Sequence, residues 1–462
     1  MRIAVIGGGN VGLVSAVLYA YLGNEVTLLE VRPDVVEQVR RGEPPFHEPG
    51  LPELLRAVQP RLKATSDPAE ALPGAELIVV AVGTPPGTDG RPDTRQLDAA
   101  IRDVARHAGP GFAVVAVKST APLGFGSYVR DLLAELLLER PGAPEIAVVS
   151  LPEFLSEGSA LRDFLYPDRI VLGGDDPRAV ELVRALYRPI EEQRFDPPAM
   201  VPRPPGLERV PFLVMSVASA ELTKYAANAF LALKVSFANE MAAVAEAFGA
   251  DVREVMTAVG LDRRIGPEFL RAGIGWGGSC FPKDTAALAA LAAEVGVDLH
   301  TVRAAREANV AARTRAVRRL AEELGGLRGR TIALCGLSFK PGTDDLRESP
   351  GVEVGRALVE WGARVRAHDP VALDRARDAG LPFELRGRPE ELVEGADALL
   401  LATEWPEYRQ WPWEALRPLF RRPLLLDGRN ALDPERMTAA GYRYLGVGFV
   451  LEETERGRRA GG

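Results

Sequence analysis

The sequence predicts an α/β protein in which two Rossmann-like, doubly wound domains are joined by a central all-helical domain with one long helix. A strand-type run at 2–6, a glycine-rich turn, a helical stretch at 13–23 and a strand at 25–29 open the chain, and the same order returns from residue 330. Between these halves, residues 219–246 contain no Pro or Gly and are rich in Ala and Leu, which is typical of one long helix. The length of 462 residues suits about three domains.

Strands alternate with helices in both halves, which indicates parallel sheets covered by helices. The further strands expected in the first half are 77–82, 113–117 and 146–149, separated by helices such as 94–107 and 127–138. The helices expected in the middle are 284–294 and 302–324, and the strands expected in the second half are 331–334, 364–368, 398–403 and 423–427. We expect domains at 1–212, 213–327 and 328–462, with the Pro-rich stretch 191–211 as a loop or linker.

Charge and cysteine content exclude several classes of protein. The 56 basic and 64 acidic residues give a net charge of −8, which argues against binding of nucleic acid through bulk charge. Two cysteines exclude a disulfide scaffold. The N-terminus lacks the pattern of a signal peptide, and no run is apolar enough for a membrane span. We therefore expect a cytoplasmic protein with no metal site and no membrane or nucleic-acid partner.

Lysine is scarce, because six of the 56 basic residues are lysine and the rest are arginine. The six are Lys63, Lys118, Lys224, Lys234, Lys283 and Lys340. A coding bias alone explains such a ratio. Under that bias, the remaining lysines mark positions where a compact ammonium cannot be replaced by a guanidinium.

The first glycine-rich turn predicts a dinucleotide site. In this pattern, Gly7 permits a tight turn, and Gly9 lets the backbone approach the pyrophosphate closely. Gly12 lets the helix pack on the strand. Glu30 ends the second strand, where a carboxylate binds ribose hydroxyls and repels a 2′-phosphate. This favours NAD over NADP, although Arg32 offers a possible phosphate ligand. Gly83, Thr84 and Pro85 end another strand at the edge where such folds bind ligands.

Other short segments carry candidate catalytic groups. The first is Lys118-Ser119-Thr120, just after an apolar strand. Glu153 and Glu157 are four residues apart and would share a face on a helical turn, with a surface-charge pair as the alternative. Lys224 and Asn228 are also four apart, on the long helix, where an ammonium and an amide can stabilise one oxyanion. The alternative is a solvated helix face.

The segment 273–284 surrounds Cys280 with glycines, which suits a backbone that passes close to a ligand and presents one side chain. Lys283 and a helix that starts at Asp284 would lower the pKa of the thiol, so we interpret Cys280 as a nucleophile and Cys335 as a core residue. A thiolate beside a nicotinamide can trap an aldehyde as a thiohemiacetal, which is oxidised to a thioester and released as an acid. The alternatives are a two-electron dehydrogenase with a structural cysteine and a protein that binds the same ligand without catalysis.

At these segments the chain closely resembles the UDP-glucose/GDP-mannose dehydrogenase family, from residue 1 to about 450. The resemblance rests on several motifs in a fixed order: GTPPGTDGRPD, KSTAPLGF, PEFLSEGSALRDFLYPDRIVLG, ELTKYAANAFLALKVSFANE, RIGPEFL, GWGGSCFPKD, GLSFKPGTDDLRESP and LLLDGRNALDPERM. It implies that UDP-glucose, two NAD and water give UDP-glucuronate and two NADH. Sister enzymes that oxidise GDP-mannose or a UDP-N-acetylhexosamine are the nearest alternative.

The resemblance also implies a role for each matching residue. Cys280 would be the nucleophile, and Lys224 and Asn228 would stabilise the oxyanion. Asp284 would act with Thr120 in proton transfer through a water. Glu153 would be the base in thioester hydrolysis, and Glu157 would support the hydrolytic water. Cofactor contacts would come from Gly7, Gly9, Asn10, Val11, Gly12, Glu30, Arg32, Gly83, Thr84, Pro85, Ser119, Thr120, Glu157, Lys283 and Arg347. Substrate contacts would come from Glu153, Phe154, Leu155, Lys224, Asn228, Arg264, Phe269, Leu270, Gly277, Cys280, Phe339, Lys340 and Arg429. Arg264 would reach the substrate of a neighbouring subunit, and the long helix would form the interface of a homodimer or higher homo-oligomer.

Overall fold

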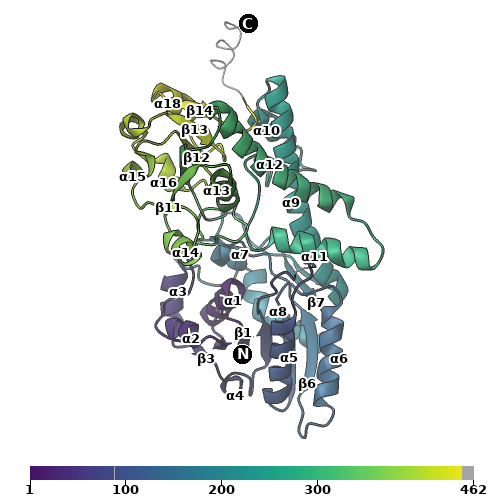
Figure 1. Cartoon of the computed structure of the whole chain (residues 1–462). Coiled ribbons are helices and arrows are strands. Elements are labelled where there is room, and N and C mark those ends of the chain that lie inside the picture. Colours follow the sequence, from purple (N-terminus) through teal and green to yellow (C-terminus); the bar gives the residue numbers. More distant parts are fainter. Residues whose placement is uncertain (88, 450–462) are drawn as a thin grey trace. The chain divides into compact units, whose positions relative to one another are not determined.

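The computed structural model describes residues 1–87 and 89–449, which form two compact units. Unit 1 contains residues 1–227 and 286–296, and unit 2 contains residues 228–285 and the chain from 297 onward. Helix α9 (Val217–Phe248) contributes its first residues to unit 1 and the rest to unit 2 (Figure 1). In the described part of the chain, no helix is both long enough and apolar enough to cross a bilayer.

Unit 1 is built on an eight-stranded sheet with the order β3-β2-β1-β4-β5-β6-β7-β8. The strands are β1 (Arg2–Ile6), β2 (Glu25–Leu29), β3 (Leu62–Thr65), β4 (Leu77–Val80), β5 (Phe112–Val117), β6 (Glu145–Ser150), β7 (Ile170–Gly173) and β8 (Phe212–Met215). All neighbours are parallel except β6 and β7, which meet at Ser150 and Gly173. The first six strands follow the doubly wound order that places a ligand site between β1 and β4.

Helices cover both faces of this sheet. One face carries α1 (Asn10–Tyr21), α2 (Pro33–Arg40), α3 (Leu51–Ala57), α7 (Ala160–Leu165) and α8 (Pro177–Glu191). The other face carries α4 (Pro68–Ala71), α5 (Arg95–His107) and α6 (Phe125–Leu137), of which α5 and α6 pack side by side (Figure 1). Ile3 and Val5 pack on the first face, and Ala4 and Ile6 on the second. Because both faces are buried, the central strands are apolar without alternation.

The Pro-rich stretch 191–211 has no helix or strand beyond Glu191, the last residue of α8, but it packs against unit 1 and is not an open linker. Gln193, Val201 and Val210 are buried in it. The buried Glu191 carboxylate accepts hydrogen bonds from Arg184 (2.9 Å) and Arg209 (2.8 Å). These ion pairs, led by the hydrogen bond from Arg184, lower the pKa of Glu191 to about 2.

The helical part of unit 2 consists of α9 from residue 228, α10 (Val252–Gly260) and α12 (His300–Leu324). Ala238, Ala242 and Ala245 of α9 form a small core with Val252 and Met256 of α10. Helix α11 (Phe281–Glu294) starts three residues before the expected position, so its first turn contains Pro282. Proline fits there because the first N–H groups of a helix have no partner within the helix.

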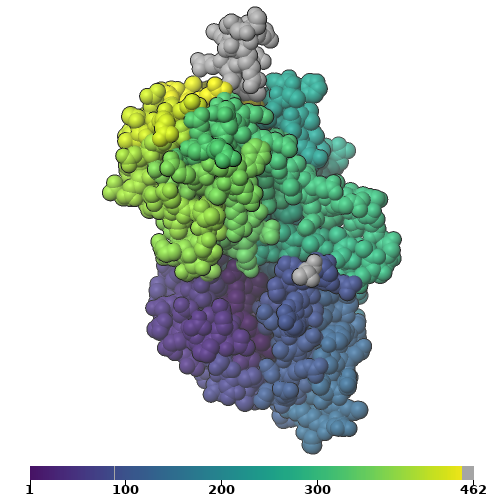
Figure 2. Space-filling view, viewed as in Figure 1, coloured from purple at the N-terminus to yellow at the C-terminus, as the bar shows by residue number. Residues whose placement is uncertain are grey.

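The second sheet of unit 2 has six parallel strands in the order β11-β10-β9-β12-β13-β14. The strands are β9 (Thr331–Cys335), β10 (Arg364–His368), β11 (Glu384–Leu385), β12 (Ala398–Leu401), β13 (Leu424–Asp427) and β14 (Arg443–Leu445). The helices are α13 (Pro350–Glu360), α14 (Leu373–Asp378), α15 (Pro389–Val393), α16 (Pro406–Arg409), α17 (Trp413–Leu416) and α18 (Pro434–Ala439). Helix α12 packs on α13, and its green surface adjoins the yellow-green surface of the C-terminal residues in Figure 2. This order repeats that of the first six strands of unit 1, which confirms the predicted α/β fold with two Rossmann-like sheets and one long helix.

Candidate active site

The predicted cofactor residues and part of the catalytic set lie at one edge of the unit 1 sheet. The carboxyl ends of β1, β4, β5 and β6 meet there because these strands are parallel neighbours. Gly7 follows β1, Gly83 and Thr84 follow β4, Lys118 follows β5, and Glu153 follows β6. The Thr84 hydroxyl donates to the Thr120 carbonyl (2.9 Å), which ties the loops after β4 and β5 together.

The glycine turn has the geometry that a pyrophosphate requires. Gly7 has φ +106°, which a side chain would strain, and a Cβ at Gly12 would lie 1.9 Å from the Gly7 carbonyl oxygen. A Cβ at Gly9 would meet nothing within 4 Å, so packing within the protein does not explain this glycine. Gly9 precedes α1 and no side chain caps this helix, so its first N–H groups are available to an anion. Asn10 and Val11 form the first turn of α1.

The Glu30 carboxylate is held beside this turn. It accepts hydrogen bonds from the backbone N–H groups of Gly8 (2.7 Å) and Arg32 (2.9 Å), and it is buried. The Arg32 guanidinium lies 3.5 Å from the carboxylate and is mostly exposed. A fixed carboxylate at this position fits the ribose of NAD and opposes a 2′-phosphate. The residues present therefore fit the predicted cofactor.

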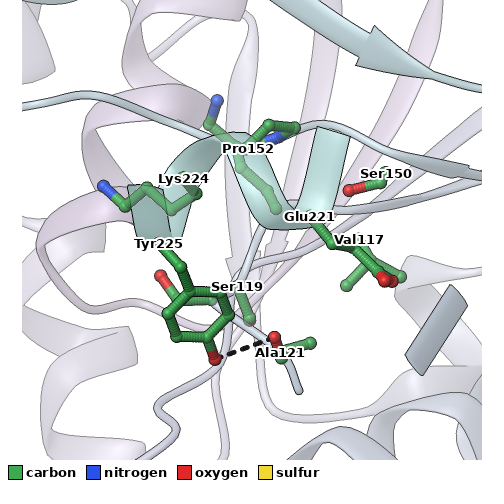
Figure 3. Close-up of a pocket in the computed structure, with 10 residues that line it drawn as sticks. Val117, Ser119, Ala121, Ser150, Pro152, Glu221, Lys224 and Tyr225 are labelled. Carbon is green, nitrogen blue, oxygen red and sulfur yellow. Dashed lines mark hydrogen bonds between the residues drawn. The ribbon is translucent and has the colours of Figure 1, made fainter. Parts of the chain in front are cut away.

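The first turns of α9 hold the loop after β5. The Glu221 carboxylate accepts hydrogen bonds from the N–H groups of Gly126 (2.8 Å) and Gly124 (2.7 Å), at the N-terminus of α6. The Tyr225 hydroxyl donates to the Ala121 carbonyl (3.0 Å), as the dashed line in Figure 3 shows. Our sequence interpretation missed Glu221 and Tyr225. Glu221 lies three residues before Lys224 and four before Tyr225, and these spacings place side chains near one face of a helix, which is the signal that was available.

Glu153 and Lys224 form a buried ion pair in unit 1. Lys224 Nζ lies 3.0 Å from Glu153 Oε1, and both side chains are at most 6% exposed. The other carboxylate oxygen accepts from the Leu155 N–H (2.6 Å). Burial acts to raise the pKa of Glu153, but the ammonium groups of Lys224 and Lys118 outweigh it, so the pKa is lowered. The Phe154 ring faces the Arg169 guanidinium (3.6 Å) and the Lys224 ammonium (5.5 Å).

The helical premise for Glu153 and Glu157 was wrong. Residues 151–156 have no helical structure, and Glu157 lies in the turn that precedes α7. The buried Glu48 carboxylate holds this turn through the N–H groups of Gly158 (2.6 Å) and Ala160 (2.9 Å). The sequence spacing suggested a helix here, but the segment is instead a turn whose N–H groups bond to Glu48.

In unit 2, Cys280 lies directly before the first residue of α11. Its carbonyl accepts the N–H of Asp284 (2.8 Å), which closes the first helical turn. The sulfur lies 3.6 Å from the Ser279 hydroxyl, and the residue is partly exposed. The N-terminus of a helix stabilises a thiolate, so this position suits a nucleophile. Cys335 is fully buried in β9, and burial raises its pKa, as expected for a core thiol.

Asp284 is held between two side chains. Asn228 Nδ2 donates to Asp284 Oδ2 (2.6 Å), and Lys283 Nζ lies 2.5 Å from Asp284 Oδ1. Asp284 is 1% exposed, so both of its oxygens are fixed in a dry environment. Asn228 and Lys283 were predicted to contact an oxyanion and the cofactor, and in this structure they orient Asp284.

The glycines around Cys280 allow close packing against the protein itself. A Cβ at Gly277 would lie 2.0 Å from the Glu348 carbonyl oxygen, and one at Gly278 would lie 2.6 Å from the Phe339 ring. The Asn309 side chain accepts from the Trp276 N–H (2.7 Å) and donates to its carbonyl. These glycines allow close packing within unit 2, and their approach to a ligand stays a prediction.

The predicted nucleotide-sugar residues of unit 2 follow β9 and β13, two strands of the second sheet that are separated by β12. Phe339 and Lys340 follow β9, and the Lys340 ammonium lies 5.7 Å from the centre of the Phe339 ring. Arg429 follows β13 and donates to the carbonyls of Ala402 (2.8 Å) and Gly275 (2.8 Å).

Four further predicted residues lie in loops of unit 2. Arg264 is exposed and pairs with Asp262, and Arg347 pairs with Asp345. Phe269 is exposed and has φ +62°, and Leu270 beside it is buried.

Comparison with known proteins decides the family. Residues 1–191 match the NAD binding domain of the UDP-glucose/GDP-mannose dehydrogenase family, residues 218–311 its central domain, and residues 333–434 its UDP binding domain. The chain belongs to this family. It is therefore an NAD-dependent oxidoreductase with a domain for a nucleotide sugar.

Relatives extend over nearly the whole chain. UDP-glucose 6-dehydrogenase of Pseudomonas aeruginosa is 43% identical over 97% of both chains, and YwqF of Bacillus subtilis, with the same name, is 39% identical over 97% of this chain and 98% of its own. A UDP-glucose dehydrogenase structure from Pyrobaculum islandicum has a TM-score of 0.85 and 40% identity, covering 97% and 98% of the two chains. A UDP-D-ManNAc dehydrogenase from Pyrococcus horikoshii has a TM-score of 0.81 and 29% identity, covering 97% and 99%.

The site residues of this family member fall into two groups. Unit 1 brings together the glycine turn, Glu30 and the buried pair of Glu153 and Lys224. Unit 2 brings together Cys280 and the fixed Asp284. Within the described residues, no group of His, Cys, Asp and Glu is arranged to hold a metal ion.

Proposed function

We propose that this protein is a UDP-glucose 6-dehydrogenase, which converts UDP-glucose, two NAD and water into UDP-glucuronate and two NADH. The observation that carries the proposal is the position of Cys280, a partly exposed thiol at the N-terminus of α11 in an otherwise cysteine-poor chain. A simple alcohol dehydrogenase needs no nucleophile, whereas oxidation from an alcohol to an acid does. Relatives named UDP-glucose 6-dehydrogenase support the choice of substrate.

Each oxidation transfers a hydride to the bound nicotinamide, which is the chemistry that NAD supplies. In the first, the 6-hydroxyl loses its proton and the carbon becomes an aldehyde. The Cys280 thiolate adds to the aldehyde carbon and forms a thiohemiacetal. Its oxidation gives a thioester, and water then releases the carboxylate and returns the thiolate.

The fixed polar groups suit the proton transfers of this sequence. Asp284 would take the hydroxyl proton with Thr120 through a water, and Lys224 and Asn228 would stabilise the oxyanions. Glu153 would accept a proton from the water that attacks the thioester. Its lowered pKa means that the carboxylate is ionised at neutral pH, the form that a base requires.

The choice of substrate and the thioester step are tested together by the NADH yield per mole of sugar. The substrates compared are UDP-glucose, UDP-galactose, GDP-mannose and UDP-N-acetylglucosamine. We expect two NADH per UDP-glucose and little from the others. One NADH per sugar would contradict the thioester mechanism. A preference for GDP-mannose or UDP-N-acetylglucosamine would show that the protein is a sister enzyme with that substrate.

The nucleophile is tested by Cys280→Ala, with Cys335→Ala as the matched control. We expect Cys280→Ala to lose formation of UDP-glucuronate, while Cys335→Ala keeps two NADH per sugar because Cys335 is enclosed in the core of unit 2. Unimpaired NADH formation by Cys280→Ala would end the covalent mechanism.

We also propose that the protein is a homodimer or a higher homo-oligomer assembled through α9. An exposed apolar residue recurs every seven positions along α9, at Phe230 (61% exposed), Phe237 (43%) and Val244 (48%). Phe248, four residues later, is 85% exposed. An exposed apolar stripe of this length on one helix face is typical of a helix–helix interface. Phe237→Glu should convert the oligomer to a monomer in analytical ultracentrifugation, and an unchanged sedimentation coefficient would contradict the interface.

The three-domain division, at 1–212, 213–327 and 328–462, stays part of this proposal. The central segment would carry the interface, and Arg264 would contribute to the substrate site of a neighbouring subunit.

A further inference from the structure

The segment that leads to Cys280 is held to the rest of unit 2 at Trp276. Asn309 of α12 accepts a hydrogen bond from the Trp276 N–H (2.7 Å) and donates to the Trp276 carbonyl (3.0 Å). Asn309 is 4% exposed, and a Cβ at Gly275 would lie 2.5 Å from its Oδ1 atom. A single buried side chain therefore holds both polar backbone groups of Trp276 at close range.

The indole ring of Trp276 extends this anchor to the start of α11. Its Nε1–H donates to the Ser236 hydroxyl of α9 (2.9 Å), and that hydroxyl donates to the Ala305 carbonyl of α12 (2.6 Å). The ring also meets Phe281, the first residue of α11, edge to face at 6.0 Å between ring centres. Trp276 thus connects α9 and α12 (Figure 1) to the residue that directly follows Cys280.

The chain between Trp276 and Cys280 has little conformational preference of its own. Gly277 and Gly278 both lie in it, and Gly278 has φ +85°, so this backbone can follow other paths at low cost. The Gly278 N–H donates to the Arg347 carbonyl (3.0 Å), which fixes one point on the path. The start of the path is fixed by the contacts of Trp276, so the position of Cys280 depends on them.

Asn309 matters most to the N–H of Trp276. The Trp276 carbonyl has a second donor, because Arg313 Nη2 lies 2.6 Å from it. Trp276 is 7% exposed, so without Asn309 its N–H would be buried without its acceptor. The segment can avoid that cost only by moving to reach water or another acceptor, and such a movement would displace Cys280.

We propose that Asn309 is a positioning residue for the Cys280 thiol. It acts through Trp276, whose fixed backbone keeps the glycine segment on the path that places the thiol before the first turn of α11. The N–H groups of a first helical turn favour a thiolate over a thiol. The catalytic consequence rests on the proposed function, in which this thiolate is the nucleophile, whereas the position of the thiol does not.

The position of the thiol is tested by the rate of alkylation with iodoacetamide over a series of pH values, on the full chain. Cys280 alone should react, because the second cysteine, Cys335, is fully buried. We expect Asn309→Ala to raise the pH of half-maximal rate by about half a unit, the effect that a helix N-terminus has on an anion. Below that pH the rate should fall about threefold.

Asn430→Ala is the matched control for loss of stability. Asn430 holds Val447 in the same way, since it accepts from the Val447 N–H (2.8 Å) and donates to the Val447 carbonyl (2.8 Å). Asn430 has φ +51°, so alanine there is also strained, and Asn430→Ala should be destabilised clearly in urea unfolding. Its alkylation profile should nevertheless match that of the wild type. Equal shifts in Asn430→Ala and Asn309→Ala would overturn the proposal, because general destabilisation would then explain both.

Steady-state kinetics test the catalytic consequence. Asn309→Ala should lower kcat about tenfold or more, because a displaced nucleophile reacts poorly, while the KM for UDP-glucose changes less than about twofold. A shifted alkylation profile with an unchanged kcat would support the positioning of the thiol and contradict its use as the nucleophile. The two proposals therefore fail separately.

An alkylation profile of Asn309→Ala that matches the wild type, or that shifts to lower pH, overturns the positioning role whatever happens to kcat. If Asn309→Ala does not fold, Asn309→Leu decides, because leucine keeps the branched shape of the side chain and removes both hydrogen bonds. A shift to higher pH in Asn309→Leu supports the proposal, and a wild-type profile overturns it.

Discussion

Replacement of Lys224 by Met should destabilise unit 1 through the carboxylate that it leaves behind. Met keeps the length of the side chain but removes the ammonium that lies 3.0 Å from Glu153 Oε1. Glu153 is then left with the Leu155 N–H and the Lys118 charge. Because both members of the pair are at most 6% exposed, water cannot replace the lost partner.

The expected loss is about 3 kcal/mol at neutral pH, since removing one partner of a buried ion pair typically costs about 3–5 kcal/mol. Lys118 keeps the value at the lower end of this range because it continues to offset the Glu153 charge. A solvent-exposed pair would lose about 1 kcal/mol or less.

The loss should depend on pH with a definite sign. In the wild type the pKa of Glu153 lies below its ordinary value of 4.5, so the ion pair stabilises fully above that value and is lost as the pH falls through the lowered pKa. In Lys224→Met, burial should raise the pKa of Glu153 instead, and stability should fall as the pH rises above 4.5. The difference between the two proteins should therefore be small near pH 4 and grow toward pH 7.

Urea unfolding at a series of pH values measures this difference, and Glu153→Gln is the matched control. The double variant Lys224→Met with Glu153→Gln should recover most of the stability, because no buried charge is left unpaired. A destabilisation that is constant with pH, or that the second substitution does not relieve, would refute the reasoning.

Three further changes test other parts of the structure. Lys224→Arg should remove most turnover while the fold is kept, because a guanidinium keeps the charge that pairs with Glu153 but cannot replace a compact ammonium that points at one oxygen. Lys63→Arg should change little. Equal effects in a coupled NADH assay would reduce the lysine pattern to coding bias. Gly277→Ala should lower the free energy of unfolding by about 1–3 kcal/mol in urea, because its Cβ would lie 2.0 Å from a backbone carbonyl oxygen. Gly387→Ala should be nearly neutral, because nothing lies within 4 Å of its Cβ position. Similar unfolding midpoints for the two variants would contradict the steric argument. Lys234→Met should raise the KM for the sugar more than it lowers kcat, because Lys234 donates to two carbonyls (3.1 and 3.2 Å) of the loop that follows α10. We expect Lys234→Arg to restore the KM. An unchanged KM in Lys234→Met would exclude this positioning role.

Local patterns predicted most of the elements. The absence of Pro and Gly predicted the long helix at 219–246, which the structure extends to Val217–Phe248, and β10 is found at the expected residues. Strands β3, β7, β8, β11 and β14, which have two to four residues each, were missed. The start of α11 was expected at Asp284, three residues too late, although proline is accepted in a first turn.

The candidate site could be predicted as a set of residue types but not as a set of contacts. The motifs indicated Glu153, Lys224, Asn228 and Asp284, yet none of the pairings among them follows from spacing. Glu153 and Lys224 are 71 residues apart, and Asn228 and Asp284 are 56 apart. The expected face shared by Glu153 and Glu157 came from a local rule, and the structure has no helix there.

The sequence by itself determined the class of fold, the two sheets whose first strand is followed by a glycine turn, the cofactor and the family. Hydrophobic periodicity or short motifs indicate each of these features. Tertiary structure alone decided which charges are buried and paired, and that the Pro-rich stretch packs on unit 1. The physical reason is that periodicity depends on neighbours within a few residues. Desolvation and ion pairing depend on segments that meet only when strands far apart in the chain end at the same edge of a sheet.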